Sequence, residues 1–91
     1  MYSSLTLQKW HKYTKKLNKN ITLVSLSLTP YLSNNSTTKI FIKIENNKTL
    51  LAELLPEKIE NKILLYNLKK ETKFTLEIEG ENDVDLLIKD N

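Results

Sequence analysis

Few side chains in this sequence could carry out acid–base, nucleophilic or metal chemistry. The chain has no cysteine, and its single histidine, His11, stands between Trp10 and Lys12 with no acidic residue nearby in sequence. A lone histidine has no partner to tune its pKa or to complete a metal site. The sequence therefore predicts no catalytic residue, no metal site and no cofactor.

Carboxylates are plentiful toward the C-terminus, but their pattern is that of a solvated surface. The acids in residues 77–85 alternate with apolar residues or lie in a turn. Residues 81–85 offer several oxygen ligands but do not follow the spacing of an EF-hand loop. The only glycine, Gly80, cannot build a glycine-rich phosphate loop. We therefore interpret the chain as non-enzymatic.

The N-terminal segment has more functional content, because basic and aromatic residues are interleaved there. Lysines neutralise phosphates and aromatic rings stack on unpaired bases, so the segment could lie along RNA or DNA. The same rings could instead pack the N-terminus against the rest of the fold. The candidate binding residues are Lys9, Trp10, His11, Lys12, Tyr13, Lys15, Lys16 and Lys19.

Charge is distributed unevenly along the chain, although the net charge is only +3. Residues 1–20 contain five lysines and no acid, whereas residues 71–91 contain seven acids and two lysines. Such asymmetry is typical of a basic arm that binds a polyanion. In a folded domain it also allows the two ends of the chain to attract each other.

Length and composition predict one globular domain. The chain has 91 residues, of which 40% are hydrophobic and 27% charged. We expect a basic arm or helix over residues 1–19 and a β-sandwich over residues 20–91. No apolar run suits a signal peptide or a membrane span, which favours an intracellular protein.

Alternation of apolar and polar residues predicts a mainly β fold, a small antiparallel sandwich of six or seven strands. Residues 3–9 fit a first strand, and residues 7–17 fit a basic amphipathic helix equally well. Residues 49–55 fit a short strand or a helical turn equally well, whereas in residues 62–68 a strand is favoured because clear strands surround it. The candidate strands are 3–9, 21–28, 39–45, 49–55, 62–68, 73–79 and 84–89.

Two turns in this pattern predict hairpins. Asparagine tolerates the left-handed backbone of tight turns, so Asn46 and Asn47 should join residues 39–45 to residues 49–55. Gly80 should begin a turn that joins residues 73–79 to residues 84–89 as a terminal hairpin with one acidic, solvent-facing side.

One local spacing resembles a known family. Leu68, Thr72 and Phe74 are spaced like the leucine, threonine and tyrosine at the corner between strands E and F of fibronectin type III domains. Phe74 stands in place of the tyrosine and Lys70 in place of the usual proline. The resemblance implies an immunoglobulin-like sandwich with a binding role, and it specifies no ligand.

The function that we expect is a non-enzymatic protein–protein interaction or structural module, a small subunit of a larger assembly. A protein partner would add a strand to an exposed sheet edge or meet a sheet face. The alternative is an RNA-binding protein that uses the N-terminal lysines. A weaker alternative is an inhibitor from a phage or mobile element that mimics nucleic acid through the acidic C-terminal hairpin. The sequence leaves the oligomeric state open.

Overall fold

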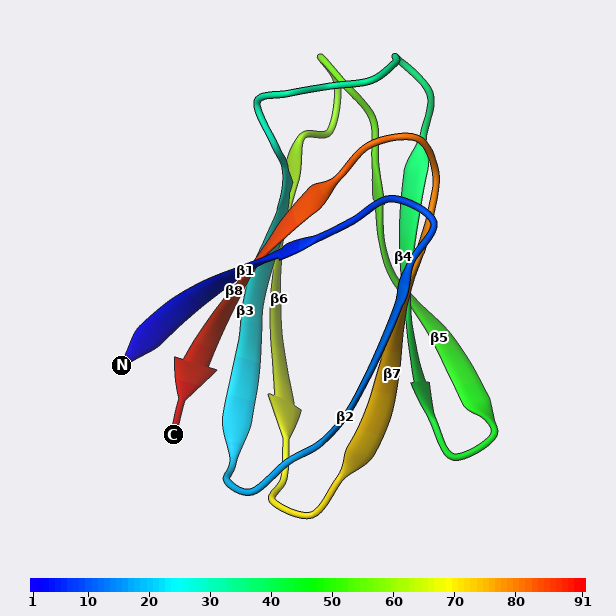
Figure 1. The fold of residues 1–91 in the computed structure, drawn as a ribbon. Coiled ribbons are helices and arrows are strands. Elements are labelled where there is room, and N and C mark those ends of the chain that lie inside the picture. The colour runs from blue at the N-terminus through cyan, green and yellow to red at the C-terminus, as the bar shows by residue number, and fades with distance from the viewer.

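A computed structural model describes residues 1–91 and shows eight strands and no helix. The strands form two four-stranded antiparallel sheets that pack face to face (Figure 1). The predicted antiparallel sandwich is confirmed. Its strands are β1 (Tyr2–Leu7), β2 (Lys12–Lys16), β3 (Ile21–Leu28), β4 (Thr38–Ile44), β5 (Asn47–Leu54), β6 (Asn61–Leu68), β7 (Lys73–Glu79) and β8 (Val84–Asp90).

Neighbours in the sheets are mostly distant in sequence. The first sheet has the strand order β1-β8-β3-β6 and the second has the order β2-β7-β4-β5. Only β4 and β5 are consecutive strands that pair with each other. Every other connection carries the chain from one sheet to the other, as Figure 1 shows.

The core lies between the two sheets and is built by the strand period of two. Alternate residues of a strand point to the same face, so each strand turns its apolar set inward. Burial of such side chains stabilises the fold by about 1.5–3 kcal/mol each. Sixteen buried hydrophobic residues form one cluster, and those without appreciable exposure include Leu7, Leu23, Leu26, Ile40, Leu54 and Val84.

The β4–β5 hairpin confirms one prediction with a shift of one residue. Ile44 pairs with Asn47, so the turn consists of Glu45 and Asn46. Glu45 has a φ of 57°, which places a residue other than asparagine in the left-handed region. The preference for a strand in residues 62–68 is also confirmed, because they lie in β6, and residues 49–55, which fit a strand or a helical turn equally, contain most of β5.

The helix considered for the N-terminal segment is wrong, because that segment forms two strands in different sheets. β1 pairs with β8 and β2 pairs with β7. The chain crosses between the sheets at Trp10, whose φ of 58° lies outside the right-handed helical region. Leu7 and Leu17, which would share one face of a helix, instead enter the core from opposite sides of this crossing.

The predicted terminal hairpin is also wrong. β7 lies in the second sheet and β8 in the first, so the two strands face each other across the core. An alternating apolar pattern buries one face of a strand whether the next strand pairs with it or packs opposite it. Glu77 and Asp85 therefore lie on opposite outer faces of the sandwich, and no single acidic hairpin surface exists.

The connections gather at two ends of the sandwich. We call the end with connections 8–11, 29–37, 55–60 and 80–83 the upper end, as drawn in Figure 1, and the end with connections 17–20, 45–46 and 69–72 the lower end. At the upper end, the buried amide of Asn82 accepts hydrogen bonds from the backbone N–H groups of Ser33 and Asn34. No helix capable of spanning a membrane is present.

Candidate interaction surfaces

The predicted binding residues do not form one surface. Lys9, Trp10 and His11 lie in the connection at the upper end, and Lys19 lies in a connection at the lower end. The others, Lys12, Tyr13, Lys15 and Lys16, follow β2 between these ends. Trp10 and His11 therefore lie apart from Lys15, Lys16 and Lys19, whereas Tyr13 stays among the lysines of β2.

Trp10 and its neighbours are held by acids of the β7–β8 connection. The indole Nε1 of Trp10 donates to Glu81 at 3.1 Å, and the backbone N–H of Lys9 donates to Asp83 at 2.8 Å. His11 Nδ1 donates to the carbonyl oxygen of Lys9 at 2.8 Å, since a carbonyl can only accept. The Trp10 ring stays 60% exposed, so it remains available for a contact.

Three of the N-terminal lysines pair with acids from the C-terminal part of the chain. Lys12 lies 3.1 Å from Glu77, Lys16 lies 3.5 Å from Glu71, and Lys19 lies 2.8 Å from Asp90. The hydrogen bond from Lys19 is the main cause of the lowered pKa of Asp90. These contacts are the attraction between the two ends of the chain that the charge asymmetry allows.

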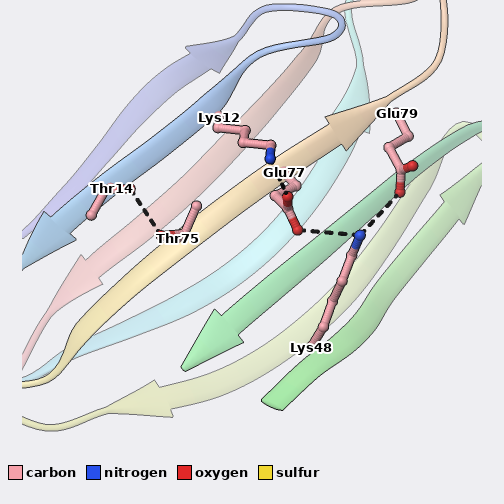
Figure 2. A network of polar contacts seen from close by, with 6 residues as sticks. All are labelled: Lys12, Thr14, Lys48, Thr75, Glu77 and Glu79. Atoms are coloured by element: carbon pink, nitrogen blue, oxygen red, sulfur yellow. Dashed lines mark hydrogen bonds and ion pairs between the residues drawn. The ribbon is translucent and has the colours of Figure 1, made fainter. Parts of the chain in front are cut away.

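The outer face of the second sheet carries a network of charges around Glu77 (Figure 2). The Glu77 side chain is 11% exposed and lies between Lys12 of β2 at 3.1 Å and Lys48 of β5 at 3.3 Å. Lys48 also lies 3.6 Å from Glu79 and 4.4 Å above the ring of Phe41. The network therefore connects all four strands of the sheet across its surface.

The electrostatics of this network fix its charge state. The hydrogen bond from Lys12, together with Lys48, lowers the pKa of Glu77 despite its partial burial. The same contact with Glu77 raises the pKa of Lys48. Glu77 and Lys48 are thus both charged at neutral pH, and neither is suited to exchange a proton in a reaction. The network is a fixed pattern of charges.

The strand register also places lysines directly opposite lysines on this face. Lys16 of β2 is opposite Lys73 of β7, and Lys43 of β4 is opposite Lys48 of β5. Between these pairs the hydroxyls of Thr14 and Thr75 share a hydrogen bond of 2.9 Å. The sequence analysis missed this arrangement, since it follows from which strands pair and in which register.

The outer face of the first sheet has a different character. Ile63 is 71% exposed and Leu65 is 64% exposed, both on the edge strand β6. Leu65 has a φ of 50° at an irregularity of the ladder, and its neighbours Leu64 and Tyr66 pack against the core. Mostly neutral residues follow along this face, including Thr22, Ser25, Ser27, Asn61, Asn67 and Leu87, and its charged residues on β8 are Asp85 and Lys89.

An apolar groove opens between β1 and β2, the edge strands on one side of the sandwich. It has a volume of about 490 Å³ and is lined by residues that include Leu5, Tyr13, Phe74 and Ile88. Lys15, which shares the inward-facing side of β2 with Tyr13, also lines it. The groove arises because β1 and β2 belong to different sheets and leave part of the core uncovered.

Comparison with known proteins gives a consistent family and fold. The sequence model of the nucleoplasmin-like domain matches residues 3–87. The structure matches the nucleoplasmin-like N-terminal domain of Drosophila FKBP39 with a TM-score of 0.84, at 18% identity over 100% of this chain and 89% of that one. No curated protein matches the chain in sequence.

Two further solved structures share the fold. The core of Drosophila NLP, described in terms of pentamer formation and histone binding, matches with a TM-score of 0.85 at 12% identity, over 99% of this chain and 97% of that one. A de novo designed double-stranded β-helix matches with a TM-score of 0.52 at 11% identity, over 100% of this chain and 99% of that one.

These matches contradict the resemblance to fibronectin type III and immunoglobulin-like domains. The local feature behind the resemblance is a real crossing between sheets, since residues 69–72 carry the chain from β6 in one sheet to β7 in the other. Leu68 and Phe74 are buried on either side of it. Any sandwich with such a crossing needs two apolar anchors there, so the spacing does not identify a family.

Proposed function

Because the chain belongs to the nucleoplasmin-like domain family, we propose that it is a non-catalytic protein-interaction module that assembles into a ring of identical copies and binds basic proteins. Drosophila NLP, whose core has the same fold, is described in terms of pentamer formation and histone binding. The observation that carries the assembly is the exposure of Ile63 and Leu65 on the outer face of the first sheet.

Copies of the chain associate through the β6 side of this face, where Ile63 and Leu65 are exposed. Exposed aliphatic side chains gathered on one surface of a domain are typical of a protein interface. The outer face of the second sheet is less suitable, because burial of its lysines and glutamates would remove their hydration. Ile63 and Leu65 therefore belong to the contact between neighbouring copies in the ring.

Mass measurement in solution tests the assembly. We expect light scattering after size exclusion to give a pentamer, as for Drosophila NLP. Leu65→Asn and Ile63→Asp should each shift the chain toward the monomer, and asparagine tolerates the left-handed backbone at position 65. Leu50→Asp is the matched control, because Leu50 is an exposed leucine on the second sheet. A wild-type monomer at all concentrations would overturn the proposal.

The upper end is the site for the basic partner. Acids gather there, in β5 and in the connections at residues 55–60 and 80–83. Lys9, Lys39 and Lys58 also lie toward this end, but none of them makes an ion pair with these acids. Glu57 and Glu60 are exposed, and Glu60 also accepts a hydrogen bond from the backbone N–H of Glu57. A positively charged protein surface fits such a potential. The acids are Glu53, Glu57, Glu60, Glu81 and Asp83.

A pair of matched double variants tests this location. Glu57→Gln with Glu60→Gln should weaken binding of purified histones, while Glu45→Gln with Glu71→Gln should not. Both variants remove two negative charges, but Glu45 and Glu71 lie at the lower end. Equal losses in the two variants would mean that only the net charge matters. Histone binding unaffected by the first variant would place the site elsewhere.

A further inference from the structure

Several lysines on the outer face of the second sheet lie directly opposite one another. Lys16 faces Lys73 and Lys43 faces Lys48 in the ladder register. Like charges directly opposite each other destabilise a pair of strands. Lys43 and Lys73 are exposed and take part in no ion pair. Lys43 and Lys73 are therefore two positive charges on this face that no carboxylate neutralises by direct contact.

We propose that this surface binds the phosphate backbone of double-stranded nucleic acid, a function beyond the proposed protein binding. Its positive groups are Lys16, Lys43, Lys48 and Lys73, which we call the lysine face. Two of these lysines continue a row of side chains that crosses all four strands in the order Thr14, Thr75, Lys43 and Lys48. Ammonium groups and hydroxyls are the side-chain donors that commonly contact phosphate oxygens.

The carboxylates near the lysine face pair with Lys16 and Lys48 and make no ion pair with Lys43 or Lys73. Glu77 lies beneath Lys48 and Lys12 and holds their ammonium groups on the surface. Glu71 pairs with Lys16 at 3.5 Å, but both side chains are about two-thirds exposed, at 66% and 65%. Such an exposed pair is weak and exchanges readily for a phosphate. The connection that enters β7 adds Lys69 and Lys70, neither of which is in an ion pair.

The choice of a duplex over a single strand follows from where the aromatic rings lie. Single-stranded nucleic acid is held by stacking of unpaired bases on exposed rings. Trp10 and His11 share a hollow with Lys48 but not with Lys16, Lys43 or Lys73, and the ring of Phe41 has the Lys48 ammonium 4.4 Å above it. The part of the lysine face around Lys16, Lys43 and Lys73 therefore offers charge and hydroxyls without a stacking platform. This combination favours contacts with a duplex backbone that are independent of base sequence.

Fluorescence anisotropy with a labelled 20-base-pair DNA of mixed sequence tests this proposal. Log affinity should fall linearly with log salt concentration, because phosphate contacts release counterions. The double variant Lys43→Gln with Lys73→Gln should weaken binding at least about tenfold and reduce the salt slope by about 1.8, at 0.9 per lost contact. Its thermal stability should not fall, since it removes opposed like charges.

Lys39→Gln with Lys58→Gln is the matched control, because it removes two lysines that lie toward the upper end. It should leave affinity and salt slope close to wild type. Equal effects of the two double variants would overturn the lysine face as the site, and no binding of the duplex at low salt would overturn the proposal. Tighter binding of polyglutamate than of DNA would also overturn it, since the partner would then be an acidic polypeptide. Histone binding and ring assembly, measured on the same variants, keep this outcome separate from that of the proposed function.

Discussion

Asn82 and Asn34, 48 residues apart in the chain, exchange two hydrogen bonds: Asn82 Nδ2 donates to the Asn34 carbonyl at 2.9 Å, and Asn82 Oδ1 accepts from the Asn34 N–H at 3.2 Å. The same oxygen accepts from the N–H of Ser33 at 2.7 Å. The Asn82 side chain is fully buried. Its amide makes the hydrogen bonds to the backbone of the β3–β4 connection that a neighbouring strand would otherwise make.

Asn82→Ala should destabilise the domain by about 1–3 kcal/mol, because three part-buried hydrogen bonds to the backbone of Ser33 and Asn34 are lost. Asn18→Ala is the control, since Asn18 is exposed. Urea unfolding compares the two variants. Equal stabilities would show that water replaces the Asn82 amide at no cost. Hydrogen exchange at Ser33 and Asn34 should also become faster in Asn82→Ala.

Gly80→Ala should be strongly destabilising. Gly80 has a φ of 151°, which side chains rarely adopt, and an added Cβ would lie 2.7 Å from the backbone Cα of Thr38. The backbone conformation alone costs about 1–3 kcal/mol, and the contact with buried Thr38 adds to it. The loss of unfolding free energy in urea measures the sum. A change below 1 kcal/mol would mean that the β7–β8 connection rearranges freely.

Glu77 should make stability depend on pH on the acid side. Its pKa is lowered in the folded state from the ordinary value of 4.5, chiefly by the hydrogen bond from Lys12. A lowered folded-state pKa stabilises the fold above the unfolded-state pKa, and this contribution is lost as pH falls through the folded-state value. Thermal melts between pH 6 and pH 3 should thus show a steeper loss in wild type than in Glu77→Gln. Glu53→Gln, at an exposed position with no ion pair, should keep the wild-type slope.

Trp10, the only tryptophan, should report on contacts at the upper end. Its ring is 60% exposed and bonded to Glu81, one of the acids proposed to face a basic partner. Binding there should shift its emission to shorter wavelength and protect it from acrylamide, because water leaves the ring. If a second method shows that the basic partner binds while the Trp10 emission stays unchanged, the contact does not lie at the upper end.

The sequence predicted strands better than it predicted their partners. Ile21–Leu28 and Lys73–Glu79 were predicted with the bounds that the structure gives them. β2 was missed because Lys12–Lys16 has a single apolar residue, Tyr13, to mark its inward side. The partner of each strand depends on pairing across the whole chain, which local alternation does not encode.

The interaction surfaces were harder still to predict. Lys43 and Lys48 face each other only because the hairpin turn falls on Glu45 and Asn46, one residue before the predicted turn. Ile63 looks like a core residue in the sequence, and its exposure follows from the edge position of β6. A residue pattern shows that a side chain is apolar, but the topology decides whether another part of the chain covers it.

The position of β8 determines when this protein can fold during its synthesis. β8 lies between β1 and β3, so the last strand to be made is the one that joins the first to the rest of its sheet. Until residues 84–90 leave the ribosome, the nascent chain carries β1 and β3 with unpaired edges, and such edges readily pair with other chains. The first sheet therefore cannot be completed before residues 84–90 have left the ribosome.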